Sequence, residues 1–163
     1  MAIDLMLEIE GVEGETKDKQ LPKGIEISGY GLSGEHPHSA SAGTGHATGQ
    51  VHLGELHVQK TMDKSSPVLF KYMNEGKHFT KVTLHCRKAV PGSGQQDFYT
   101  ITLNEVFVTA YSENGGGGSD HLPNESWSFS YTKIKKEYKP QKEDGSLGAS
   151  SPVSYDVKAR EAA

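Results

Sequence analysis

Cysteine is nearly absent from this chain, and long apolar runs are absent altogether. The single cysteine, Cys86, cannot form an internal disulfide, and its place in an alternating segment predicts a buried thiol. No apolar run approaches the roughly 20 residues that span a bilayer, so we expect no membrane insertion. The N-terminal segment lacks a basic region and carries acids within its apolar run, which predicts a strand instead of a signal peptide. We therefore expect synthesis in the cytoplasm and any export by a route without a cleavable leader.

An excess of basic charge is also missing. The chain has 17 Lys and Arg against 21 Asp and Glu, a net charge of −4, which gives no electrostatic reason to expect nucleic acid as a partner. A local basic stretch is present nonetheless, with lysines at positions 133, 135, 136 and 139. We interpret it as a solvated face or as a match for an acidic neighbour.

Apolar residues make up 34% of the chain, and 19 glycines separate short alternating runs. This composition favours an all-β fold, and a chain of 163 residues is expected to form a single domain over 1–163. Alternation predicts strands within 3–9, 25–32, 51–62, 81–87, 98–111, 127–138 and 153–157. The apolar residues change parity near Asn104 and Glu105, which indicates a bulge or a strand that passes between two environments. Residues 158–163 are expected to be a flexible end.

One segment predicts a helix. Ser65 and Ser66 are suitable N-cap residues, and Pro67 suits the first turn. Leu69 lies on the apolar face, and Gly76 is suited to end the helix in a left-handed conformation. About two and a half turns are too few for stability alone, so we expect the helix to cover a sheet.

Residues 33–50 form the segment least able to fill a core, because it has no large apolar side chain. Its histidines at 36, 38 and 46 raise the hypothesis of a metal site, but the glycine and serine content opposes a fixed tetrahedron. We expect an exposed contact arm or a mobile loop. The residues of this arm that we single out for contacts are Ser33, Glu35, His36, His38, Thr44 and His46.

Motifs of catalysis are missing. The chain has no G-x-S-x-G, no H-E-x-x-H and no paired acid cluster, and residues 115–118 lack the spacing of a nucleotide-binding loop. We therefore expect no enzymatic activity and no cofactor.

The order of several short segments resembles the Hcp family, the haemolysin-coregulated tube proteins of the bacterial type VI secretion system. The resemblance covers nearly the whole chain and rests on residues 60–67 (KTMDKSSP), Tyr99-x-Ile101-x-Leu103, and Asp144-Gly145 behind the motif Tyr138-x-Pro140-Gln141. The residues that match the family signature are Lys60, Asp63, Ser66, Pro67, Leu69, Gly76, Arg87, Lys88, Tyr138, Pro140 and Gln141. The chain departs from the family at Tyr30, Leu32 and Tyr155, where members often carry tryptophan.

The resemblance implies a small antiparallel β-barrel of about eight strands with one short α-helix, assembled as a hexameric ring with a wide channel. Stacked rings would make a tube that a contractile sheath propels, with a spike protein at its tip. Small effector proteins would be carried or chaperoned in the channel, and the subunit itself would be secreted. In the family, the loop that matches 33–50 is an arm that reaches a neighbouring subunit or ring.

The alternative is a secreted β-sandwich module that binds a ligand, similar to a lectin. It shares the composition, and mass in solution separates it from a ring.

Overall fold

The computed structural model describes residues 2–39, 47–118 and 120–162. Most of them are in strands, and one helix is found in this part of the chain, which confirms the predicted fold class. The strands are β1 (Ile3–Ile9), β2 (Ile25–Glu26), β3 (Gly29–Gly31), β4 (Gly34–Glu35), β5 (His38–Ser39), β6 (Ala47–Thr48), β7 (His52–Leu53), β8 (Leu56–Thr61), β9 (His78–Val90), β10 (Gly94–Asn114), β11 (Asn124–Ser130), β12 (Lys133–Tyr138), β13 (Ser151–Asp156) and β14 (Glu161–Ala162). The helix is α1 (Ser66–Glu75). None of the helices described is long and apolar enough to cross a membrane.

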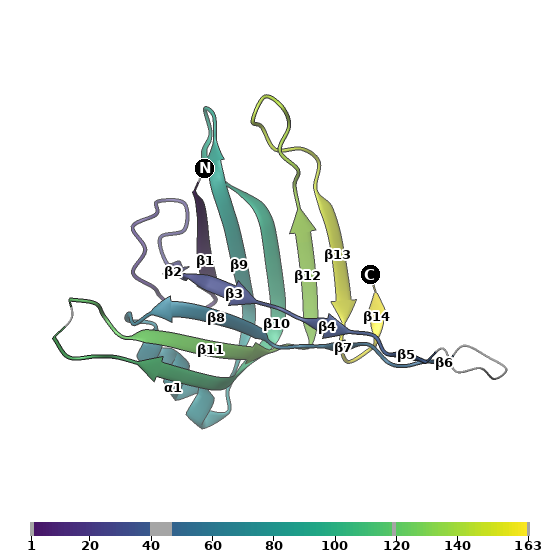
Figure 1. The fold of residues 1–163 in the computed structure, drawn as a ribbon, viewed down its shortest axis with the longest axis horizontal. Coiled ribbons are helices and arrows are strands. Elements are labelled where there is room, and N and C mark those ends of the chain that lie inside the picture. The colour runs from purple at the N-terminus through teal and green to yellow at the C-terminus, as the bar shows by residue number, and fades with distance from the viewer. Residues whose placement is uncertain (1, 40–46, 119, 163) are drawn as a thin grey trace.

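Two layers of antiparallel strands make the body. In the first layer β2, β1, β9, β10, β12, β13 and β14 pair in that order. In the second layer β10, β11, β8 and β3 pair in that order. Figure 1 shows the first layer upright, with β8 and β11 crossing below it and α1 underneath.

Strand β10 belongs to both layers. Its residues 99–104 pair with β12, and its residues 107–114 pair with β11. Between these parts Glu105 takes a φ of 48°, a conformation that side chains other than glycine rarely adopt. The bend places Leu103 and Val106 both in the core at 0% exposure, although they are three residues apart. The parity change predicted near Asn104 and Glu105 is confirmed, and it is the point where the strand changes layer.

The paired strands do not close into a continuous cylinder among the described residues, because β14 and β3 end the main run of pairing. The segment 25–31 spans the gap between β1 and β8. Ile27 donates its N–H to Leu5 O at 3.2 Å, and Ser28 donates its N–H to Gln59 O at 2.7 Å. Because β2 pairs with β1 and β3 pairs with β8, the segment is the edge of both layers and links them.

The core lies between the layers and is filled by aliphatic side chains with Phe79, Trp127 and Phe129. Cys86 is among its buried members, which confirms the predicted buried thiol, and burial raises the pKa of this thiol.

Helix α1 closes one end of this core with Leu69, which is fully buried. Gly76 ends the helix at a φ of 64°, as predicted. Ser65 stands at the predicted N-cap position, but it has helical dihedral angles and its side chain makes no capping hydrogen bond. The carboxylate of Asp63 instead accepts the backbone N–H of Ser65, at 2.9 Å, just before the helix begins. The Ser65 hydroxyl also donates to the Asp63 carboxylate, so it is turned away from the N–H groups of the first helical turn.

Candidate functional site

We name strands β12 and β13 the flange. They continue the first layer from β10 beyond the edge of the core. One row of side chains across the layer runs Leu84, Ile101, Lys136 and Val153. Leu84 and Ile101 are buried, at 0% and 1% exposure, whereas Val153 is 65% exposed. The strands of the second layer pair with β10 through β11 and not with the flange. Val153, at the outer end of this row, is therefore a core-type side chain of the flange that the described part of its own chain leaves uncovered.

A groove of about 310 Å³ follows the inner face of the flange. It is lined by Leu32 and Leu53 on one side and by Ile134, Val153 and Tyr155 on the other. The exposed large apolar residues of the flange and the strands beside it are Tyr30 at 38%, Leu53 at 37%, Tyr138 at 47% and Val153 at 65%. Such a gathering of exposed apolar side chains marks an interaction surface.

The predicted arm begins beside this groove. Strand β4 pairs with β7 through Gly34 and Leu53, and β5 pairs with β6 through His38 and Thr48. Figure 1 shows these short strands as a narrow ribbon that projects from the body. At its base the Gly54 N–H donates to Ser33 O at 2.7 Å. A Cβ on Gly54 would lie 2.5 Å from the Ser33 hydroxyl, so the two strands approach this closely only with glycine there.

The histidines predicted in the arm do not gather as metal ligands in the described part. The rings of His36 and His38 lie 4.6 Å apart, and His36 Nε2 is 2.7 Å from Gly49 O. The described residues contain no group of three or more side chains able to hold a metal. The predicted contact residues Thr44 and His46 lie outside the described residues. Glu35 pairs with His52 across the ribbon.

Several residues of the predicted family signature meet where β8 joins α1. The ammonium group of Lys60 is fully buried and lies 2.9 Å from Glu125 Oε2 and 3.0 Å from Asp63 Oδ1. The Ser66 hydroxyl donates to Glu125 at 2.8 Å, and Trp127 Nε1 donates to the same oxygen at 3.0 Å. A buried ion pair is costly unless hydrogen bonds satisfy it in this way. The cluster, which we name the junction cluster, fastens the helix to β8 and β11.

Glu125 was missed at the level of sequence, although a signal for it existed. It shares the parity of Trp127 and Phe129, so the alternation that turns these rings inward also turns the carboxylate inward. Among the other signature residues, Pro67 begins the first turn of α1 beside this cluster.

A second cluster surrounds Arg87, on the outer face of β9. Arg87 Nη1 lies 2.6 Å from Asp18 Oδ2, Nη2 donates to the side-chain carbonyl of Gln20, and Nε lies 3.2 Å from Asp97 Oδ1. Burial would raise the pKa of Asp18, but the N–H groups of Gln20 and Leu21, together with Arg87, outweigh it and lower that pKa. The cluster holds the loop between β1 and β2 against the sheet.

The remaining signature residues, Lys88, Tyr138, Pro140 and Gln141, make separate contacts that do not involve Arg87. Lys88 stands over the ring of Phe98, 4.7 Å from its centre. Tyr138 pairs with Tyr99, while Pro140 O accepts the N–H of Gly148 at 2.6 Å. Gln141 donates to Gly145 O at 2.8 Å. The contacts of Pro140 and Gln141 shape the loop between β12 and β13.

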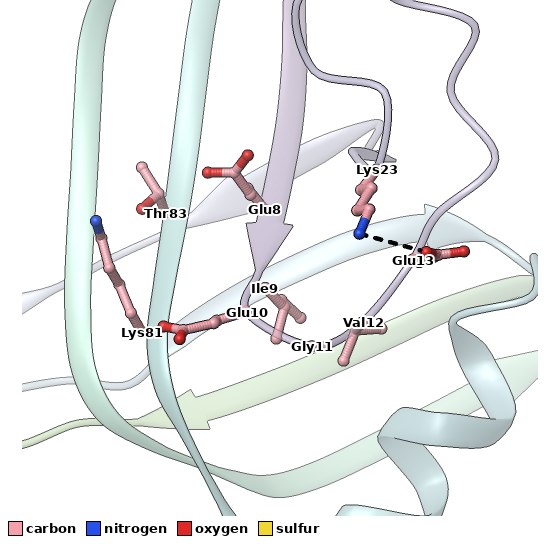
Figure 2. Close-up of a pocket in the computed structure, with 9 residues that line it drawn as sticks. All are labelled: Glu8, Ile9, Glu10, Gly11, Val12, Glu13, Lys23, Lys81 and Thr83. Carbon is pink, nitrogen blue, oxygen red and sulfur yellow. Dashed lines mark ion pairs between the residues drawn. The ribbon is translucent and has the colours of Figure 1, made fainter.

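The outer face of the first layer is polar. A hollow of about 360 Å³ lies at the end of β1. Figure 2 shows Glu8 and Thr83 beside each other in its lining, with Lys81 and Glu10 below them. Glu13 and Lys23 close it with an ion pair of 3.6 Å. Charges of both signs and a hydroxyl group line it, which is the chemistry of a wall that faces water.

An uncovered apolar sheet face, a projecting ribbon and a polar outer wall define a structural subunit that assembles with other protein chains. A family model described as "Type VI secretion system effector, Hcp" matches residues 6–138, and the chain belongs to this family. The family predicted from the sequence is confirmed, and so is the function of a type VI secretion tube protein.

Individual relatives agree with this assignment. The chain is 34% identical to the protein Hcp1 of Pseudomonas aeruginosa over 155 residues, which are 95% of this chain and 94% of the relative. A solved type six secretion system protein superimposes with a TM-score of 0.90 at 27% identity, over 99% of this chain and 100% of that one. Hcp1 from Salmonella typhimurium superimposes with a TM-score of 0.81 at 28% identity, over 100% of both chains. These relatives support the tube protein and not the lectin-like alternative.

Proposed function

We propose that the chain forms hexameric rings in which each copy covers the flange of the next, and that these rings stack into the tube of a type VI secretion system. The observation that carries the proposal is the row Leu84–Ile101–Lys136–Val153, which runs from full burial to open solvent on one continuous face. Each buried apolar side chain gains about 1.5–3 kcal/mol relative to exposure, so a second copy over this face is favoured.

The edge of the flange supports the same assignment. Strand β14 pairs with β13 only through Tyr155 and Asp156, so the edge at 151–154 has no neighbouring strand among the described residues. An open edge is a template for a further strand. When unlike surfaces of identical copies meet, the contacts close into a ring if the rotation is suitable.

The two faces of the first layer then take different roles. The apolar inner face would lie between copies, and the polar outer face around Glu8 and Thr83 would line the channel and meet carried effector proteins. The ribbon at 34–53 would reach a neighbouring subunit or ring. The contractile sheath and the spike protein would be its other partners, the subunit would act without catalysis, and it would be exported through the secretion system after synthesis in the cytoplasm. A Pseudomonas aeruginosa relative, 28% identical over 118 residues, is named "Major exported protein".

The test is the substitution Val153→Asp, which places a charge in the proposed contact. Burying an unpaired polar group costs about 2 kcal/mol, so association should weaken about 30-fold per contact. Light scattering coupled to size exclusion should give six times 17.7 kDa for the wild type and a smaller mass for the variant at equal concentration.

Pro152→Asp is the matched control, because this neighbouring side chain is exposed, lies on the opposite face of the strand and does not line the groove. It should keep the mass of the wild type, and circular dichroism should show both variants folded. A Val153→Asp protein that keeps full-size rings at the wild-type concentration would remove the flange from the interface.

A further inference from the structure

A second uncovered surface lies beside α1, at the opposite end of β10 from the part that pairs with the flange. Phe70 is 43% exposed, and its ring meets Tyr111 edge-on, with 5.3 Å between ring centres. Tyr111, itself 37% exposed, stacks on Trp127 at 4.9 Å. These three rings form one wall of a cleft of about 300 Å³, which we name the helix cleft.

The helix cleft carries an excess of negative charge. Glu113, Asp63 and Glu125 contribute carboxylates to its lining. The ammonium group of Lys60 balances only part of this charge, and it is fully buried. Glu113 is exposed and makes no ion pair with any described residue. Aromatic rings beside uncompensated carboxylates favour a cation from outside.

The groove on the flange has the complementary composition. Its lining is apolar except for Ser33, Ser154 and one cation, Lys136, which is exposed and has no ion-pair partner in the described part of the chain. Lys136 stands in the same row as Val153, so the charge and the exposed apolar side chain are presented together.

We propose that the helix cleft of one copy is covered by the flange of the next copy, with Lys136 placed against Glu113 and with Phe70 packed against Val153. The proposal rests on the ring assembly proposed above and names the two surfaces that form its contact. A head-to-tail contact requires two unlike patches on each copy, and these two are apolar, opposite in charge and borne by different elements. Each copy could then give its flange to one neighbour and its helix cleft to the other.

An exchange of charges tests the pairing. The single variants Lys136→Glu and Glu113→Lys each place like charges together, and association should weaken about fivefold per contact in each. The double variant restores an opposite pair and should recover most of the loss. Lys135→Glu, on the opposite face of the same strand, is the matched control and should leave the ring population unchanged. Two single losses that merely add in the double variant would overturn the pairing.

Crosslinking tests the same contact without relying on charge. Asn74 lies one helical turn from Phe70 on the same face, so Asn74→Cys combined with Val153→Cys places thiols on both surfaces. A short bis-maleimide should produce a ladder of covalent oligomers up to six chains from the double variant, and none from Val153→Cys alone, because Cys86 is buried. A ladder from Ile3→Cys with Val153→Cys, and none from the Asn74 pair, would instead assign the flange to the N-terminal strand and overturn the proposal.

The masses of the uncrosslinked proteins separate this proposal from the one on which it rests. Six-chain rings that fail to crosslink through Asn74 and Val153 would refute the contact and leave the ring intact. A wild type that stays at 17.7 kDa would refute the ring itself.

Discussion

Replacing Lys60 with methionine leaves two carboxylates inside the subunit without their counter-ion. The Lys60 side chain is 0% exposed, the Glu125 side chain is 2% exposed, and the Asp63 side chain is 11% exposed. Methionine is similar in length and fills the same space, so the change isolates the charge from the packing. Removal of one partner from a buried ion pair costs about 3–5 kcal/mol.

That loss is large beside the total stability of a domain, which is about 5–15 kcal/mol. For a chain of this size it corresponds to a fall in melting temperature of roughly 6–20 °C. The double variant Lys60→Met/Glu125→Gln should regain part of the loss, because its buried carboxyl group is no longer charged. Asp63 is better placed to recover water, since its side chain retains some exposure.

The single tryptophan makes the measurement direct. Trp127 donates to Glu125 and stacks on Tyr111, so its fluorescence reports the junction cluster as well as global unfolding. Urea unfolding should be followed at a concentration where all variants are single subunits. Lys64→Met is the control, because the Lys64 ammonium group pairs among the described residues only with the exposed Glu13, at 3.5 Å, and such pairs contribute under about 1 kcal/mol. A loss for Lys60→Met no larger than that of the control would refute the reasoning that this charge is buried and essential.

Three further predictions concern other parts of the subunit. Gly76→Ala should lower the free energy of unfolding by about 1 kcal/mol, measured by thermal unfolding, because alanine is strained at a φ of 64°. The control Gly116→Ala, in an open loop, should lower it by less. Equal losses in the two variants would contradict this prediction. Asp18→Asn should reduce the free energy of unfolding most above pH 3.8, the ordinary pKa of an aspartate. The difference from wild type should vanish as the pH falls through the lower pKa that Asp18 has in the folded protein. A difference that does not change with pH in urea titrations would exclude the ion pair with Arg87 as its cause. Shortening the arm within 39–49 should leave single rings folded and weaken their stacking, and equal tube content in negative-stain images would show that the arm does not hold rings together.

Local signals in the sequence were sufficient for the helix and for the bend in β10. The effects of Pro67, Leu69 and Gly76 on the backbone depend only on residues close in the sequence, so their pattern predicts both the helix and its end. The change of parity near Glu105 is likewise visible in a few consecutive residues, and β10 bends there from one layer into the other.

Other elements depend on contacts that no local pattern contains. The segment predicted as one strand over 51–62 is divided into β7 and β8, because Gly54 bonds to Ser33 at the base of the arm. The short strands of the arm contain small and polar residues, and they form because the backbone ladder satisfies their N–H and C=O groups. Alternation of apolar residues could not reveal them.

The clusters around Lys60 and Arg87 show the same limit. Their partners Glu125 and Asp18 lie 65 and 69 residues away along the chain. The sequence indicated Lys60 and Arg87 only through the family resemblance, and the partners became visible only when the fold brought the segments together. The exposure of Val153 could not be predicted from the sequence either, because its strand has the same alternation as a core strand. Val153 is exposed because its strand lies near the edge of the first layer.

The mass of the wild-type protein in solution tests the central claim most directly. If the inner face of the flange is completed by an identical copy, light scattering at micromolar concentration should give six times 17.7 kDa, and negative-stain images should show annular particles. A stable, monodisperse species of 17.7 kDa that stays a monomer on concentration would contradict the account.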